Sequence, residues 1–190
     1  MAEILRDRPF FDESRGGVTF SGGEPLLQPA FLRELLAACK QEGIHTALDT
    51  AGFAPREVVL SLLETVDLFL FDFKLADPEK HWYYTGVSNA PILENLSLID
   101  QAGGKIILRC PVIPGLNDGW DNLRELGELA TSLKSLEKIS LLPYHHLGEA
   151  KYKKFGHPYK LAGFNSPSPG EIKKIQSFLE GLGVVVTIGG

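Results

Sequence analysis

Two kinds of segment alternate along the chain, and the alternation predicts an α/β protein. Short runs rich in apolar and β-branched residues occur at 18–20, 45–48, 67–71, 105–109, 138–142 and 184–188. Longer segments between them repeat apolar residues every three or four positions, which is typical of amphipathic helices. These segments are 31–40, 58–63, 92–99, 123–133 and 172–182. The chain is therefore expected to alternate strand and helix and to end on a sixth strand.

Strands that alternate with helices favour a parallel sheet with right-handed crossovers. The predicted strands are apolar along most of their length, as expected where both faces of a sheet are covered. A complete eight-stranded barrel takes about 250 residues, so 190 residues fit a partial barrel or an open doubly wound sheet. No repeat or linker divides the chain, and we interpret residues 1–190 as a single domain. Residues 145–168 lack periodicity and are predicted to form a long loop.

Polar residues gather at the carboxyl ends of the predicted strands, where parallel α/β proteins place their chemistry. They are Gly22, Gly23 and Glu24 after the first strand, Asp49 and Thr50 after the second, Asp72 and Lys74 on the third, Arg109 at the end of the fourth, and His145 after the fifth. Asp72 and Lys74 are two residues apart, so they share one face of a strand. The apolar residues around them indicate a central strand, where both charges need partners. We therefore predict one mouth that brings Asp49, Asp72 and Lys74 together.

Purely structural interpretations stay open for these residues. Gly22 and Gly23 could form a tight turn, and Glu24 could cap a helix that begins near Pro29. Asp49 could likewise belong to an ordinary cap. The residues by themselves do not decide between these roles and a binding site.

The chemistry of the predicted mouth suits a zwitterionic ligand. Lysine and arginine bind a carboxylate, whereas aspartate and free carbonyl groups bind an ammonium group. Asp49 and Thr50 also offer the hard oxygen ligands that small cations prefer. The chain has neither a Walker-type nor a dinucleotide-binding glycine pattern. An amino-acid-bearing ligand is therefore favoured over a nucleotide phosphate.

Composition excludes several classes of protein. The 19 basic and 24 acidic residues give a net charge of −5, which argues against nonspecific binding of nucleic acid. The longest apolar stretch is interrupted by Asp67 and Asp72 and falls short of the roughly 20 residues of a membrane span. The first residues lack the apolar region of a signal peptide. Two cysteines, Cys39 and Cys110, make no disulfide framework, so we predict a cytoplasmic protein.

Six segments resemble, in order, the motifs of the glycyl-radical-enzyme activating enzymes. This family, which includes the pyruvate formate-lyase activating enzymes, belongs to the radical S-adenosylmethionine superfamily. The segments are 16–28, 48–53, 72–74, 81–86, 109–118 and 142–148, the last with Lys151 and Tyr152. A Gly-Gly-Glu-Pro sequence alone is common, but six motifs in the family's order are specific. The resemblance extends over nearly the whole chain.

The resemblance implies a partial (β/α)6 TIM-like barrel with parallel strands, and it implies a role for each polar residue. Gly22, Gly23 and Glu24 would meet the methionyl amino group of S-adenosylmethionine; Asp49, Thr50 and Asp72, with a carbonyl near Leu70, would hold a monovalent cation; Lys74 and His145 would contact the carboxylate or ribose; Pro111 would lie near the adenine; and Arg109 would meet the substrate's glycyl loop. The implied reaction is reductive cleavage of S-adenosylmethionine by a 4Fe–4S cluster. The 5′-deoxyadenosyl radical then takes a hydrogen atom from a glycine of a partner glycyl-radical enzyme, and flavodoxin is a typical reductant.

The sequence departs from the family at the cluster. Relatives hold it with a CxxxCxxC loop after the first strand of the barrel, and two cysteines are fewer than the three or four thiolates required. We therefore expect the C-terminal part of an activating enzyme, without the first βα unit, without cluster ligands or other catalytic residues, and inactive alone. Smaller departures are Arg15, where relatives often carry glycine, and Ala51, where they often carry Cys, Ser or Asn.

A missing first unit would turn residues 18–20 into an exposed edge strand. Such an edge invites pairing with another chain. We expect either cover from the nearby Phe10 and Phe11 or self-association through this edge.

Two other functions stay open. A barrel with an inward lysine could be a Schiff-base aldolase that uses Lys74 as its amine. Alternatively, the chain could be a non-catalytic scaffold that binds S-adenosylmethionine or another protein. The motifs do not name the partner glycyl-radical enzyme.

Overall fold

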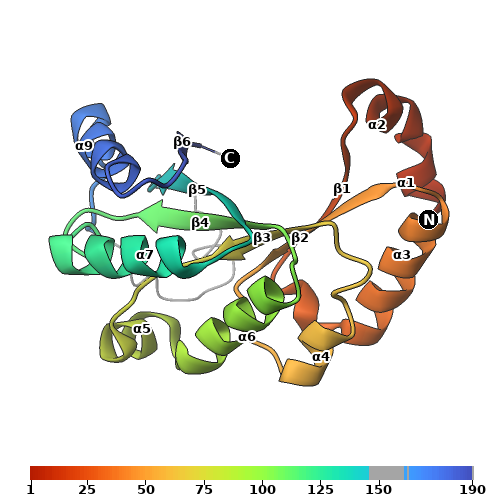
Figure 1. The fold of residues 1–190 in the computed structure, drawn as a ribbon, viewed down its shortest axis with the longest axis horizontal. Coiled ribbons are helices and arrows are strands. Elements are labelled where there is room, and N and C mark those ends of the chain that lie inside the picture. Colours follow the sequence, from red (N-terminus) through yellow and green to blue (C-terminus); the bar gives the residue numbers. More distant parts are fainter. Residues whose placement is uncertain (146–160, 162, 190) are drawn as a thin grey trace. The chain divides into compact units, whose positions relative to one another are not determined.

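The computed structural model describes residues 1–145, 161 and 163–189, with helices and strands in alternation (Figure 1). The strands are β1 (Gly17–Phe20), β2 (His45–Thr50), β3 (Leu68–Asp72), β4 (Ile106–Val112), β5 (Leu136–Pro143) and β6 (Val186–Ile188). The helices are α1 (Ala2–Arg6), α2 (Arg8–Ser14), the 3-10 helix η1 (Pro25–Leu27), α3 (Pro29–Gln41), α4 (Arg56–Leu60), α5 (Pro78–Thr85), α6 (Ala90–Gln101), α7 (Trp120–Ser132) and α9 (Pro169–Glu180).

The six strands form one sheet in the order β1-β2-β3-β4-β5-β6. The pairs β1–β2, β2–β3 and β5–β6 are parallel. Strands in sequential order with intervening helices are those of a partial (β/α)6 barrel. The predicted α/β fold with parallel strands is therefore confirmed.

The chain divides into two compact units. The first consists of Met1–Asp72, Ala90–Ile107 and Leu133–Glu137, and the second of Phe73–Asn89, Leu108–Ser132 and Lys138–Gly190. Each is described below by itself. The interpretation of residues 1–190 as a single domain stays a prediction.

The core of the first unit lies on one face of β2 and β3. Leu48 pairs with Phe69, and Thr50 pairs with Phe71. Both phenylalanines are 1% exposed, and they line the same small cavity as Val59 near the end of α4. Full burial of such large side chains contributes about 1.5–3 kcal/mol each. The predicted central position of this strand is confirmed.

The core of the second unit follows the alternation of β4. Leu108, Cys110 and Val112 are buried, whereas Arg109 and Pro111 alternate with them on the other face and are half-buried. Helices α7 and α9 contribute buried leucines and isoleucines to this unit. A capping box between Ser168 and Glu171 begins α9, and the hydrogen bonds from Ser168 lower the pKa of the Glu171 carboxyl.

Two boundary predictions were wrong where they touch the candidate site: the end of the fourth strand, and the placement of Lys74 on the third strand, since β3 ends at Asp72. The fourth strand was expected to end at Arg109, but β4 continues to Val112. Pro111 lacks an N–H group, but pairing continues beyond it, because the main-chain oxygen of Val112 accepts from the Tyr144 amide at 3.0 Å. Glu24 was considered as a cap of the helix near Pro29. It caps η1, where its carboxylate accepts from the amide of Leu26.

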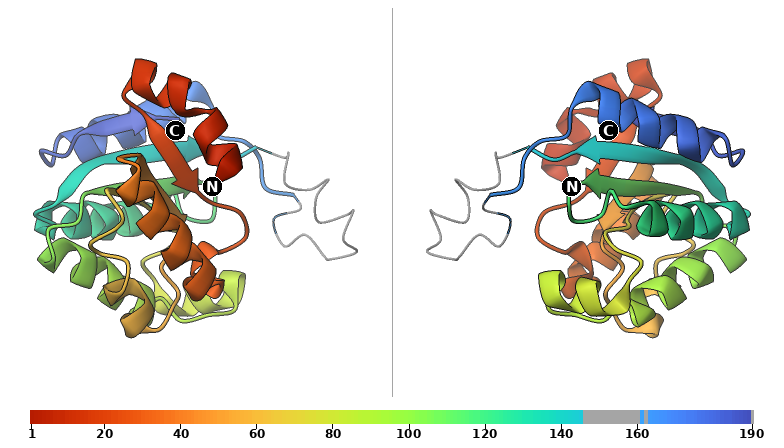
Figure 2. Two further views of the ribbon diagram at one scale, coloured as in Figure 1. Left: turned by 90° about the vertical axis from the view of Figure 1, so that its right-hand side faces the viewer. Right: turned by 90° about the vertical axis from the view of Figure 1, so that its left-hand side faces the viewer.

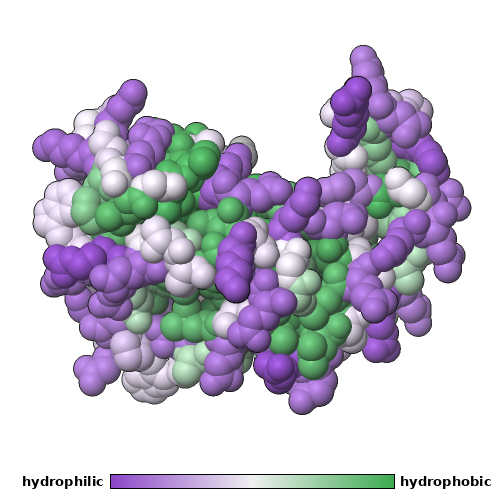
Figure 3. Space-filling model, in the orientation of Figure 1, coloured by the Kyte–Doolittle hydropathy of each residue, from purple (hydrophilic) through white to green (hydrophobic). Residues whose placement is uncertain are grey.

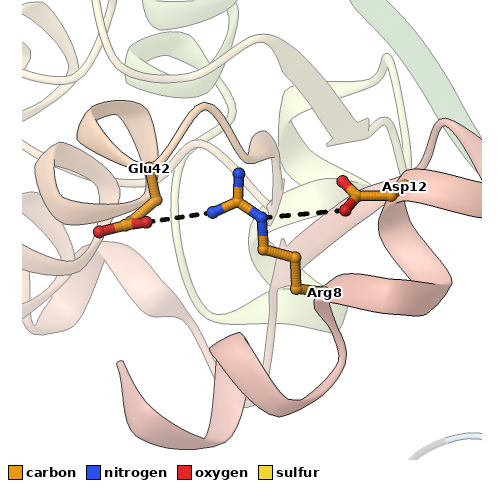
Figure 4. A network of polar contacts seen from close by, with 3 residues as sticks. All are labelled: Arg8, Asp12 and Glu42. Carbon is orange, nitrogen blue, oxygen red and sulfur yellow. Dashed lines mark hydrogen bonds and ion pairs between the residues drawn. The ribbon is translucent and has the colours of Figure 1, made fainter.

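The N-terminal helices α1 and α2 were not predicted, because no apolar periodicity marks them. They bury no residue of their own. Figure 2 shows them as a pair from which β1 leads away, and Figure 3 shows mostly hydrophilic residues on the visible side of this pair. Arg8 ties the pair to α3, since its Nη1 lies 3.0 Å from Glu42 Oε2 and its Nε lies 4.0 Å from Asp12 Oδ2 (Figure 4). Such exposed ion pairs contribute about 0–1 kcal/mol.

The edge strand β1 is not covered as we expected. Phe10 is 67% exposed, and Thr19 on the strand itself is exposed. Phe11 instead lines a groove of about 290 Å³ with residues that include Gly16 and His45. Self-association through β1 stays a prediction.

Arg15 ends α2 in the left-handed conformation, with φ of 55°. This conformation costs a residue with a Cβ about 1–2 kcal/mol, whereas glycine adopts it freely. We expect Arg15→Gly to raise the free energy of unfolding by about 1 kcal/mol, measured by urea denaturation. The matched control is Arg33→Gly in the interior of α3, which should lower it by about 1 kcal/mol. Two changes of the same sign would contradict this explanation.

Within the described residues, no helix has the length and apolar character of a membrane span. The predicted loop at 145–168 lies mostly outside the described residues, and so do Lys151 and Tyr152 of the last motif.

Candidate functional site

The loop after β1 is joined to the end of β2 through one carboxylate, that of Glu24. Its Oε1 accepts hydrogen bonds from Thr50 Oγ1 at 2.7 Å and from the Leu26 amide at 3.1 Å. Its Oε2 accepts from the amide of Ala51 at 2.9 Å. A half-buried carboxylate with three donors is well satisfied. Glu24 therefore sets the position of the glycine loop relative to β2.

The hydrogen bonds continue from β2 into the following loop. Thr50 Oγ1 accepts from the Gly52 amide at 2.9 Å. The Nδ2 group of the buried Asn95 in α6 donates to the main-chain oxygens of Gly52 and Ala54, each at 2.9 Å. Ser21 Oγ adds a bond of 3.1 Å to Asp49 Oδ2. The two loops of the first unit thus form one connected network.

Gly22 and Gly23 present an open backbone in this network. The backbone of Gly22 has a φ of 138°, an angle that residues with a side chain rarely adopt. A Cβ on either glycine would meet no atom within 4 Å. Both residues are exposed. Conformation therefore favours glycine at position 22, crowding requires glycine at neither position, and a ligand can approach both peptide groups closely.

The two aspartates predicted for the site, Asp49 and Asp72, share a face of the sheet in the first unit. Asp49 pairs with Leu70, and Asp72 follows two residues later on the same face. Thr50 pairs with Phe71 on the opposite face. The hydroxyl of Thr50 is already engaged by Glu24 and Gly52, so Thr50 can reach a ligand beside the aspartates through its main chain.

The other predicted site residues belong to the second unit. Lys74 follows the end of β3 and is half-buried; its main-chain oxygen accepts from Asn117 Nδ2 at 3.0 Å. Arg109 and Pro111 lie on the same face of β4, and His145 is exposed just after β5. The predicted meeting of Asp49 and Asp72 with Lys74 stays a prediction.

Sequence reasoning missed the buried asparagines. Asn89, Asn95 and Asn117 are all at most 6% exposed, and their amides bond to main-chain atoms. Asn117 stood within a recognised motif, but the motif gave it no role. The sequence offered no signal for them, since each has a polar or charged neighbour in the sequence: Ser88, Glu94 or Asp118.

The described residues fit S-adenosylmethionine better than they fit an iron–sulfur cluster. The open glycine backbone and the carboxylates of the first unit suit an amino-acid moiety. No group of three His, Cys, Asp or Glu side chains that could hold a metal ion occurs among the described residues. Cys39 is fully buried, and burial raises the pKa of its thiol, which disfavours the thiolate that a cluster needs. The two cysteines of the sequence are fewer than the three or four thiolates of a 4Fe–4S cluster.

Because Glu24 receives three hydrogen bonds, we expect Glu24→Gln to destabilise the first unit. The amide of glutamine keeps one acceptor but turns an N–H group toward a donor. The free energy of unfolding should fall by about 1–3 kcal/mol, measured by urea denaturation. Glu34→Gln on the exposed side of α3 is the control and should change it by less than about 0.5 kcal/mol. Equal values for both variants would refute this role of Glu24.

The family model and the similar proteins described here all indicate the same family. The model of the Radical SAM superfamily matches residues 1–127. The chain is 42% identical over 177 residues to the choline trimethylamine-lyase activating enzyme of Oleidesulfovibrio alaskensis, covering 92% of this chain and 57% of that protein. It is also 42% identical over 185 residues to the pyruvate formate-lyase 1-activating enzyme of Escherichia coli K12, covering 96% of this chain and 75% of that one.

A solved structure agrees. The crystal structure of a domain of the pyruvate-formate lyase-activating enzyme from Bacteroides vulgatus superposes with a TM-score of 0.78 at 35% identity, covering 92% of this chain and 99% of that one. The match extends over almost the whole of both chains, so the two folds correspond over the matched residues. The family resemblance read from the six motifs is confirmed.

Proposed function

Since this chain belongs to the Radical SAM superfamily, among the activating enzymes of glycyl-radical enzymes, we propose that it forms the S-adenosylmethionine-binding part of such an enzyme. The whole enzyme would generate a glycyl radical on a partner enzyme by reductive cleavage of S-adenosylmethionine. The observation that carries this proposal is the open Gly22–Gly23 backbone, held against β2 by Glu24.

Each predicted residue has a task in binding and orienting. The peptide groups of Gly22 and Gly23 would bind the methionyl ammonium group, with Glu24 fixing their position. Lys74 and His145 would bind the carboxylate or ribose. Pro111 would contact the adenine, and Arg109 on the same face of β4 would bind the partner's glycyl loop. In the whole enzyme, S-adenosylmethionine cleaved with one electron from a 4Fe–4S cluster would supply the radical chemistry, and the two cysteines of this sequence are too few to hold that cluster.

We assign the monovalent cation to the shared face of Asp49 and Asp72. Asp49 and Asp72 supply carboxylate oxygens, which are ligands that small cations prefer. The main chain of Thr50 would complete the set. A flavodoxin-like reductant and a cytoplasmic setting follow from the same family chemistry and remain part of the proposal.

Binding of S-adenosylmethionine to the 190-residue chain tests the proposal. We expect weak binding, seen in ¹H–¹⁵N spectra as shifts at Gly22 and Gly23. Lys74→Ala should weaken binding about tenfold, because a charge-assisted hydrogen bond to the carboxylate is lost. Lys80→Ala in the first turn of α5 is the control and should leave the affinity unchanged.

A different experiment tests the aldolase alternative, and the titration itself tests the scaffold alternative. Borohydride trapping of a carbonyl compound on Lys74 would instead support a Schiff-base aldolase, which no comparison favours. Absence of shifts at Gly22 and Gly23 at saturating ligand would contradict the proposal and leave a protein-binding scaffold.

A further inference from the structure

Three asparagines of the second unit hold the segment that carries Lys74. Asn89 directly precedes α6, Asn117 lies in the turn after β4, and Asn122 lies in the first turn of α7. The strand β3 has ended at Asp72, so no regular ladder holds Lys74, Leu75 and Ala76. Instead, the side-chain amide groups of the three asparagines hydrogen-bond to the main chain of this segment.

Asn117 is the centre of this arrangement. It is 6% exposed. Its Nδ2 donates to the main-chain oxygens of Lys74 at 3.0 Å and Pro111 at 2.6 Å, and its Oδ1 accepts from the Ile113 amide at 2.8 Å. Both amide hydrogens are used. One side chain therefore joins the segment after β3, the strand β4 and the turn after it.

Asn122 and Asn89 complete the support. Asn122 Oδ1 accepts from the Ala76 amide at 2.9 Å, and its Nδ2 donates to the main-chain oxygen of Asn117 at 2.8 Å. Asn89 Nδ2 donates to the oxygens of Ala76 at 2.7 Å and Leu75 at 3.4 Å. The carbonyl groups of three consecutive residues thus all accept from asparagine amides.

We propose that Asn117 and Asn122 are positioning residues for Lys74: by fixing its backbone they set where its ammonium group is presented. The inference rests on the proposed function, in which Lys74 binds the carboxylate of S-adenosylmethionine. A lysine side chain is long and flexible, so the position of its charge is defined only if its backbone is held. Fixing the backbone before binding lowers the entropy that the ligand must overcome.

The test measures the reactivity and the NMR resonance of the Lys74 amino group. All lysines are labelled by reductive methylation with ¹³C-formaldehyde, and the Lys74 signal is assigned by its absence in Lys74→Arg. In Asn117→Leu and Asn117→Asp, we expect Lys74 to react at least threefold faster and its resonance to move toward those of exposed lysines. The aspartate variant keeps the shape but cannot donate to the two carbonyls. The other lysines should not change.

The control is Asn95→Leu, which removes an equally buried amide that bonds to main-chain oxygens of the first unit. It should leave the Lys74 rate and resonance unchanged. If the Asn117 variants do not fold, Asn122→Ala replaces them, since Asn122 is half-buried and makes two bonds. An unchanged Lys74 signal in the folded variants, or the same change in Asn95→Leu, would overturn the proposal.

A second measurement separates positioning from general structure. Asn117→Leu should weaken S-adenosylmethionine binding about tenfold, but it should add no further loss in the Lys74→Ala background. Additive losses would overturn positioning through Lys74. If Lys74→Ala itself leaves binding unchanged, the ligand role of Lys74 in the proposed function is wrong, and the labelling result still decides whether Asn117 positions the lysine.

Discussion

Treated with iron and sulfide under strictly anaerobic conditions, the 190-residue chain is expected to take up no 4Fe–4S cluster and to cleave no S-adenosylmethionine. A cluster needs about three or four thiolates, and the sequence has two cysteines. Cys39 is fully buried on α3, and burial raises the pKa of its thiol. The expected effect is complete, because no partial ligand set is available.

The measurement is bound iron and acid-labile sulfide per chain, together with the visible absorbance of the protein after desalting. Cys39→Ala is the matched control and should bind the same residual iron as the unmodified chain. A stoichiometric brown chromophore accompanied by cleavage of S-adenosylmethionine would show that the prediction is wrong.

The largest effect on stability is expected for Gly52→Ala. Gly52 has a φ of 72°, and a Cβ there would lie 2.2 Å from Cζ of Phe71. The ring of Phe71 is 1% exposed, so it must shift within the core to make room for a Cβ at position 52. Left-handed strain and overpacking together should lower the free energy of unfolding by about 2–5 kcal/mol. This is a large part of the roughly 5–15 kcal/mol that holds a typical domain together.

Gly43→Ala is the matched control for the steric part. Gly43 has a similar φ of 66°, but a Cβ there would meet no atom within 4 Å. Its substitution should cost only the conformational part, about 1–2 kcal/mol. Both variants are compared by urea denaturation. If Gly52→Ala costs no more than Gly43→Ala, Phe71 does not restrict this position.

The same glycine links stability to the candidate site. The Gly52 amide donates to Thr50 Oγ1, and Thr50 in turn donates to Glu24. A shift of the Gly52 backbone would therefore disturb the loop that presents Gly22. Gly52 therefore connects two parts of the first unit: it packs against Phe71 in the core, and its amide is linked through Thr50 to Glu24 in the proposed ligand loop.

The strand–helix order could be predicted from the sequence because buried strands and amphipathic helices each leave a periodic pattern. The short helices α1, α2 and α5 left none, since their apolar residues are too few for a stripe. The end of β4 was placed too early, at Arg109, because the sequence does not show that the Val112 carbonyl accepts from the Tyr144 amide.

Some features of the candidate site could likewise be predicted from the sequence, and others could not. Gly22 and Gly23 were predictable, since a strand end followed by two glycines marks an open backbone regardless of what surrounds it. The shared face of Asp49 and Asp72 depended on the register between β2 and β3. Alternation fixes faces within one strand, but only pairing fixes them between two strands.

By itself, the sequence determined the α/β order, the family, the glycine loop and the shortage of thiolates, because each depends on residue types and their spacing. Only the tertiary structure decided that Glu24 bonds to Thr50 and Ala51, and that Asn117 holds the backbone of Lys74. The two residues of each hydrogen bond are far apart in the sequence, with separations of 26, 27 and 43 positions. Two of the three partners are main-chain groups, which every residue type carries, so no choice of side chain in the sequence reveals them.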